Sequence, residues 1–193
     1  MVGGGGLLSY DGNQFTNIQK TNTTPYNLID ETISSIIYDD EHGWYIGSNY
    51  AITNLTKEGE YKHLLRSDKV AKKYISDDPF VEKNKGLPNE KITALAFSED
   101  GNIWVGLNHT LLKVSKKLDI INHYVPLGNI NEKNETSFGK SSLKIVDIIS
   151  LTKNGLLLAT ARMGVIKFDI NTNTSDKLFV STGGYITGIE NLK

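Results

Sequence analysis

Short apolar runs alternate with turn-forming residues along most of the chain, and this pattern is clearest between residues 92 and 124. The runs there are residues 92–97, 103–106, 111–114 and 120–124. Asp100 and Gly101 separate the first two runs, and an Asp-Gly pair supplies the positive φ that a tight hairpin turn needs. Four short strands joined in this way predict one antiparallel meander, which is too small to bury its own faces. We therefore expect the meander to stack on copies of itself.

Other parts of the chain repeat this unit. Isoleucines that begin equivalent first strands stand at positions 33, 92, 145 and 186, with spacings of 59, 53 and 41 residues. Four-stranded propeller blades have a period of roughly 40–50 residues, and inserted loops lengthen that period. The repeat therefore predicts an all-β protein with the architecture of an incomplete β-propeller.

The predicted propeller covers residues 1–193, as about three full four-stranded blades with a partial blade at each end. The full blades are residues 33–65, 92–125 and 145–180, the partial blades are residues 3–18 and 185–193, and two insertions occupy residues 66–86 and 126–140. The first partial blade provides a third and a fourth strand, and the last provides a first strand. Because the second strand is missing and glycines 3–6 make a poor core strand, we expect an open propeller or a ring completed by another chain.

The two tryptophans of the chain fall in the predicted second strands. The segment from Gly43 to Gly47 aligns with residues 102–106, and we interpret Trp44 and Trp104 as occupying the same position of the repeat. The middle strands of a blade lie between neighbouring blades, so both indole rings are expected to be buried in that layer. Replacing Trp104 by alanine should then cost about 3–5 kcal/mol.

A resemblance to a known family rests on two stretches of the central repeat. Residues 87–95 read LPNEKITAL and residues 100–106 read DGNIWVG. They resemble the two-component-regulator propeller repeat, whose pattern is LPxxxVxxixxDxxGxiWiGTxxGl. The third copy departs from the pattern, with Leu157 in place of the tryptophan and Ala161-Arg162 in place of small turn residues.

The resemblance implies a part of the sensor region of a bacterial hybrid histidine kinase. Such a region is periplasmic or otherwise extracytoplasmic, takes part in signal transduction, and in many members responds to products of glycan breakdown. Residues 1–6 do not read as an export signal, so this location requires a signal that is not in this sequence. Related repeats also resemble those of streptogramin lyases, which use a histidine, a glutamate and a magnesium ion, and no such set can be placed here.

Composition and charge narrow the classes of partner. Lysine and arginine number 21 against 22 aspartate and glutamate residues, and this balance produces no field that would attract nucleic acid or anionic lipid. No apolar run approaches the roughly eighteen residues of a membrane span, so direct membrane insertion is not expected. Cysteine is absent, which excludes disulfides and thiolate metal sites.

The sequence shows no catalytic constellation, cofactor motif or metal-binding spacing, so we predict neither an enzyme nor a cofactor in this segment. The four histidines follow no metal-ligand spacing. Asp39, Asp40 and Glu41 lack the alternating ligand pattern of a calcium loop, and we interpret them as a solvated hairpin turn.

Candidate ligand contacts follow from the geometry of a meander. The turn between strands two and three lies at the same end of a blade as the connection to the next blade, where both insertions lie. Long loops that converge on one rim often bind ligands. This reasoning selects Tyr50, His109 and Arg162, and the arginine suits a carboxylate or sulfate.

A streptogramin-lyase-like enzyme is the least favoured class of function, and two other classes are favoured over it. One is a ligand-sensing or binding module, whose partner is a small molecule or a glycan. The other is a structural or assembly module of the bacterial envelope, whose partner is another protein chain or the remaining propeller blades.

Overall fold

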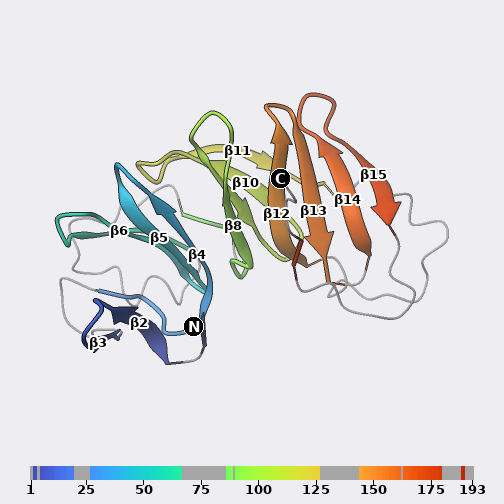
Figure 1. Ribbon diagram of the computed structural model, residues 1–193. Helices are drawn as coiled ribbons and strands as arrows, with labels where there is room; N and C mark the ends of the chain where they lie inside the picture. The colour runs from blue at the N-terminus through green and yellow to red at the C-terminus, as the bar shows by residue number, and fades with distance from the viewer. Residues whose placement is uncertain are drawn as a thin grey trace. The chain divides into compact units, whose positions relative to one another are not determined.

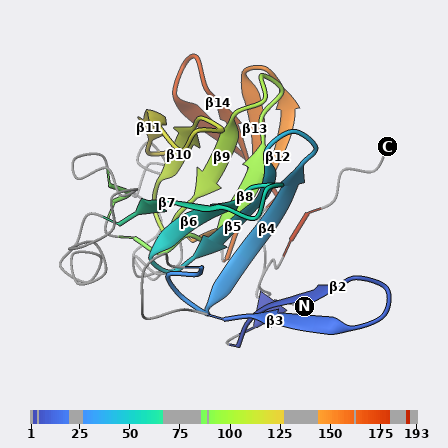
Figure 2. The same cartoon turned by 90° about the vertical axis from the view of Figure 1, so that its left-hand side faces the viewer.

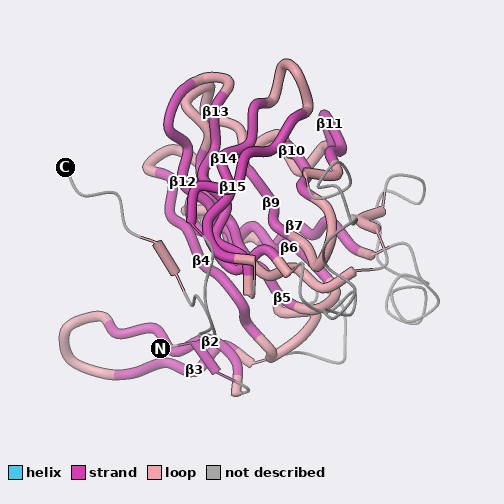
Figure 3. Tube along the Cα trace, turned by 90° about the vertical axis from the view of Figure 1, so that its right-hand side faces the viewer, coloured by secondary structure: helices cyan, strands magenta, loops and turns pink. Residues whose placement is uncertain are grey.

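The computed structural model describes residues 2–3, 5–19, 27–66, 86–88, 90–126, 144–161, 163–179 and 188–189. The regular elements in these ranges are all β-strands, drawn as arrows in Figure 1 and in magenta in Figure 3. Within the same ranges, no helix has the length and apolar character needed to cross a bilayer. The predicted all-β class is confirmed, whereas most of both insertions lies outside the described residues.

The chain divides into two compact units, Met1–Ile92 and Thr93–Lys193. The first unit contains two antiparallel sheets. A three-stranded sheet holds β1 (Val2–Gly3), β2 (Gly6–Tyr10) and β3 (Phe15–Ile18) in that order. A four-stranded sheet holds β4 (Ile33–Asp39), β5 (Gly43–Ser48), β6 (Ala51–Leu55) and β7 (Tyr61–Leu65) in chain order.

The second unit contains two further four-stranded sheets. One holds β8 (Ala94–Phe97), β9 (Ile103–Gly106), β10 (Leu111–Val114) and β11 (Ile120–Tyr124). The other holds β12 (Ile145–Thr152), β13 (Gly155–Thr160), β14 (Gly164–Asp169) and β15 (Thr174–Phe179). In every sheet, strands adjacent in sequence pair antiparallel, so each sheet is the meander of one propeller blade.

The three-stranded sheet contains a strand that the sequence interpretation left missing. Val2 and Gly3 form β1 and pair with Leu7 and Gly6 of β2. In Figure 2, the β2–β3 hairpin lies near the end at which β4 begins. Leu7 and Ile18, one from each strand of this hairpin, pack against a cluster of Leu28, Ile33 and Ile46 in the first unit.

The second unit shows how two of these sheets pack face to face. Trp104 of the β8–β11 sheet lies in one apolar cluster with Leu156, Leu158, Ile166 and Phe168 of the β12–β15 sheet. Tyr124 fills the layer between the sheets, with its ring centroid 5.8 Å from that of Trp104 and 5.8 Å from that of Phe168. The predicted burial of Trp104 is therefore confirmed, with 1% of the residue exposed.

The interpretation that the two tryptophans are equivalent is wrong. Gly47 pairs with Ser35 and Gly106 pairs with Ala94, which fixes the alignment of the two blades. Trp44 then lies three residues before its glycine and Trp104 only two. Because side chains alternate along a strand, a shift of one residue turns Trp44 to the opposite face of its sheet.

The position equivalent to Trp104 in the first unit is taken by Tyr45, which is fully buried. Trp44 instead leaves 43% of its surface exposed and contacts the ring of Tyr38 at a centroid distance of 4.6 Å. The expected burial of Trp44 is therefore wrong as well.

Candidate functional site

The turn between β5 and β6 contains Tyr50, the first of the residues predicted to contact a ligand. Its side chain is half-buried and packs against Ile29, Ala51 and Leu65. The Cζ atom of Arg66 lies 4.9 Å from the centre of the Tyr50 ring, a cation–π arrangement that positions the ring. One face of this tyrosine is therefore already occupied by a cation.

Arg66 holds the turn together from the end of β7. Its backbone N–H donates to the carbonyl of Tyr50 over 2.9 Å, and its Nη1 donates to the carbonyl of Asn49 over 3.2 Å. Only 8% of the residue is exposed. The sequence interpretation assigned Arg66 to the start of an insertion and gave it no role, since no motif marks an arginine that folds back on the preceding turn.

The ends of the first insertion meet beside this turn. Arg66 and Leu87 form an isolated parallel bridge, and the N–H of Leu87 donates to the carbonyl of Leu65 over 2.7 Å. The chain therefore leaves β7 and returns at Leu87 to the same place, next to Tyr50.

The turn between β9 and β10 contains His109, the second predicted contact residue. The N–H of Leu107 donates to the carbonyl of Thr110 over 2.9 Å and closes the turn. His109 is half-buried at its tip. The turn is thus a short, tightly closed loop that presents an imidazole.

The third predicted residue, Arg162, lies outside the described residues, but the residues on either side of it are described. Met163 is buried, and its N–H donates to the hydroxyl of Thr160 over 3.0 Å. The N–H of Ala161 donates to the carbonyl of Lys144 over 2.9 Å.

Within the second unit, the base of the His109 turn and the turn at residues 161–163 lie at the same end of their sheets. The carbonyl of Lys144 accepts the hydrogen bond from Ala161. The N–H of the next residue, Ile145, donates to the carbonyl of Leu107 over 3.3 Å. Residues 144 and 145, which follow the second insertion, therefore lie between the two turns. Tyr50 belongs to the first unit.

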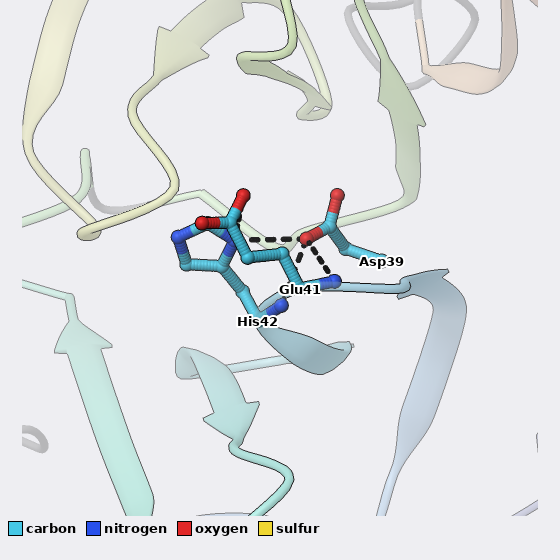
Figure 4. Close-up of side chains that lie close together, drawn as sticks. All are labelled: Asp39, Glu41 and His42. Atoms are coloured by element: carbon cyan, nitrogen blue, oxygen red, sulfur yellow. Dashed lines mark hydrogen bonds and ion pairs between the residues drawn. The ribbon is translucent and has the colours of Figure 1, made fainter.

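Asp39, Glu41 and His42 gather at the opposite end of the first four-stranded sheet, in the β4–β5 turn (Figure 4). Their possible ligand atoms lie within 4.8 Å of one another, so the donor set is chemically suited to a divalent cation. However, Oδ1 of Asp39 already accepts hydrogen bonds from the backbone N–H of Glu41 (3.1 Å), from that of His42 (2.8 Å) and from Nδ1 of His42 (2.8 Å).

The same aspartate arrangement recurs at other hairpins. Asp11 accepts from the N–H groups of Asn13 and Gln14, and Asp169 accepts from those of Asn171 and Thr172. These backbone donors lower the pKa of both Asp11 and Asp169. The carboxylate therefore closes the turn at all three hairpins, and turn formation accounts for the position of the Asp39 side chain.

Lys113 and Asp100 form an ion pair over the tryptophan of the second unit. The Nζ atom of Lys113 contacts Oδ2 of Asp100 and lies 5.3 Å from the centre of the Trp104 ring. Burial raises the pKa of Asp100, but the hydrogen bonds from Lys113 and Ser98 outweigh this effect and hold it well below its usual range. The ammonium group of Lys113 therefore lies over the buried indole ring.

Stacked four-stranded antiparallel meanders define the chain as a protein of the β-propeller class. The family model described as "Two component regulator propeller" matches residues 86–109, which confirms the resemblance noted in the sequence for this stretch. No curated protein matches the chain.

Solved structures share the fold. Streptogramin B lyase is 13% identical, with a TM-score of 0.53 over 86% of this chain and 44% of that chain. The Pan2 WD40 domain of Neurospora crassa is 11% identical, with a TM-score of 0.51 over 89% of this chain and 41% of that chain. At these identities the likeness concerns the fold alone.

Sensor proteins are also among the similar structures. The extracellular domain assigned to a hybrid two component system of B. thetaiotaomicron is 20% identical, with a TM-score of 0.48 over 94% of this chain and 26% of that chain. The chain thus spans less than half the length of each of these three structures.

Proposed function

We propose that the chain is a non-catalytic, ligand-binding propeller module from the extracytoplasmic sensor region of a two component system. The observation that carries the proposal is the family match at residues 86–109, which include the complete β8–β9 hairpin. Propellers use their loops for recognition, because the sheets supply a rigid support while loop sequences can vary. The module therefore binds its ligand at the loop ends and passes the signal to another part of a longer polypeptide.

The proposed contacts are Tyr50, His109 and Arg162. They offer an aromatic ring, an imidazole and a guanidinium group, which suit the ring faces, hydroxyls and acidic groups of a carbohydrate. The ordering of the Tyr50 turn by Arg66 supports this choice, since a ring held in place loses less conformational entropy on binding. The proposed ligand class is accordingly an oligosaccharide, with acidic sugars favoured by Arg162.

Isothermal titration calorimetry with neutral and uronic-acid-containing oligosaccharides tests this proposal. We expect heat from at least one sugar, and His109→Ala should weaken its binding about tenfold or more, equivalent to one lost hydrogen bond to a charged or polar group. Arg162→Met should weaken acidic sugars more than neutral ones. Lys57→Ala, an exposed change in the β6–β7 turn at the other end of its sheet, is the matched control. An absence of heat with every sugar would contradict the ligand class.

A second candidate function is an assembly module of the envelope. The observation that favours it is the set of large apolar side chains left exposed on the β2–β3 hairpin. Light scattering that shows a strict monomer, together with an absence of partners in pull-downs, would count against it.

A further inference from the structure

The contact between the two sheets of the second unit shows how one blade receives the first strand of the next. Ala94 of β8 and Ile148 of β12 lie in the same buried apolar cluster. Ile145 packs so closely on Gly106 of β9 that a Cβ added to this glycine would lie 2.9 Å from Cγ2 of Ile145. The first strand of one blade therefore lies on the first two strands of the preceding blade.

The spacing of the repeat predicts where this contact recurs one blade further along the chain. The spacing of 53 residues between the second and third copies makes Asp147 the equivalent of Ala94. The spacing of 41 residues to the next copy makes Ile189 the equivalent of Ile148. Ile189 is therefore expected to lie beside Asp147, as Ile148 lies beside Ala94.

The structure contains the expected contact, with a hydrogen bond at its centre. The backbone N–H of Ile189 donates to Oδ2 of Asp147 over 2.9 Å. Oδ1 of the same carboxylate accepts from the N–H of Ile148 over 2.8 Å, which orients the side chain. A Cβ added to Gly188 would lie 3.3 Å from Oδ2, so the backbone approaches the carboxylate closely at this glycine. Sequence spacing and geometry thus agree that Gly188 and Ile189 lie beside Asp147.

The face of the β12–β15 sheet that carries Asp147 is covered near this contact and more open away from it. Asp147 pairs with Ala159 and Ile149 pairs with Leu157, so these four side chains lie on one face, here called the Asp147 face. Ala159 is fully buried, whereas Ile149 and Leu157 are half-buried. Leu151, further along β12, is 39% exposed. The exposed fraction thus rises with distance from Asp147.

We propose that the Asp147 face is the docking surface of the chain segment that contains Gly188 and Ile189, and that the Asp147 carboxylate holds this segment in place. At the equivalent position of the preceding blade, Ala94 offers only a methyl group, and the contact there is apolar. A carboxylate can hold a backbone N–H instead, because hydrogen bonds to charged acceptors are stronger than those to neutral ones. The docking involves the second unit alone and does not depend on the proposed sugar ligand.

Hydrogen exchange of the backbone amides, followed by NMR on the 193-residue chain, tests the role of the carboxylate. The N–H of Ile189 should exchange about tenfold or more faster in Asp147→Ala than in the wild type. This variant installs the residue of the equivalent position and should leave the sheet folded. Asp147→Asn keeps an acceptor oxygen and should retain part of the protection. Asp176→Ala, which removes an exposed carboxylate from β15, is the matched control and should change nothing at Ile189. Equal exchange of this amide in the wild type and in Asp147→Ala would overturn the proposal.

A single introduced thiol tests whether the segment covers the Asp147 face. The chain has no cysteine, so Ala159→Cys provides one thiol on this face and Leu151→Cys provides an exposed reference in the same sheet. The thiol at residue 159 should react with a thiol reagent about tenfold or more slowly than that at residue 151, and should approach its rate when Asp147→Ala is added. Equal rates without that change, or protection that survives it, would contradict the proposal. Thermal unfolding verifies that each variant is folded, and the amide exchange test stands should Ala159→Cys fail to fold.

Discussion

Trp44 and Trp104 lie in the second strands of successive blades, yet one is exposed and the other is buried. Trp104 lies between two sheets, with Tyr124 on one side of its ring and Lys113 over it. Trp44 is offset by one residue, contacts Tyr38, and points to the opposite face of its sheet. The comparison shows that the register of a strand, and not the residue type, decides which side chain enters the core of a blade.

The largest expected effect is the difference in stability between the alanine variants of these two tryptophans. Trp104→Ala should lower the free energy of unfolding by about 3–5 kcal/mol, because it leaves a cavity in a layer that is otherwise filled. Trp44→Ala should cost about 1 kcal/mol, because much of the ring already contacts water. Urea unfolding of both variants measures the difference, and equal losses would show that the two rings are equally buried in solution.

The next largest effect is the difference in stability between alanine variants of two hairpin glycines in the first unit. Gly43 has a φ of +88°, and a Cβ there would lie 2.3 Å from the carbonyl oxygen of Leu55. Gly12 has a φ of +102°, with no atom within 4 Å of such a Cβ. Gly43→Ala should therefore cost about 2–3 kcal/mol and Gly12→Ala about 1 kcal/mol.

Thermal denaturation checks this ranking, with Gly59→Ala as a control, since Gly59 also has a positive φ and open space around it. Gly59→Ala should resemble Gly12→Ala. A Gly43 variant as stable as the Gly12 variant would mean that β6 can shift away from the turn at little cost.

The smallest effect depends on pH and concerns the ion pair above Trp104. The pKa of Asp100 is lower in the folded chain than in the unfolded chain, so the folded state releases this proton more readily. The pair therefore stabilises the fold above about pH 4, and this contribution is lost as the pH falls below that value. Since the carboxylate is partly exposed and screened by water, we expect only about 0.2–1 kcal/mol.

Asp100→Asn should remove this part of the pH dependence. Denaturant unfolding at pH 7 and at pH 3 measures it, because the wild type and the variant should differ more at the higher pH. Glu99→Gln, which removes an exposed carboxylate outside the ion pair, changes the net charge by the same amount and provides the control. A variant that loses as much stability at pH 3 as at pH 7 would contradict the assignment of the low pKa to this pair.

Much of the fold could be predicted from the sequence, because Asp-Gly turns and isoleucine spacing encode the meander locally. Two features of the fold could not be predicted from the sequence. The two-residue strand β1 forms from a glycine-rich stretch, since pairing with β2 satisfies its backbone despite a low strand propensity. The offset of Trp44 was missed because Tyr45 is also aromatic, so a shift of one residue left the apolar pattern of the strand unchanged.

The candidate site could be predicted only as a set of turns. The positions of Tyr50 and His109 follow from chain order, because turns in a meander alternate between the two ends of the sheet. The contact between Arg66 and the Tyr50 ring does not follow, since it joins residues at opposite ends of the β6–β7 segment. Arg162 lies outside the described residues and remains a prediction.

The two indole rings also give the chain a built-in optical reporter. Each unit contains one of the two tryptophans, and their surroundings differ in polarity. Fluorescence from Trp104 should therefore lie at shorter wavelengths than that from Trp44, and the loss of the blue component on heating would follow the second unit without any attached dye.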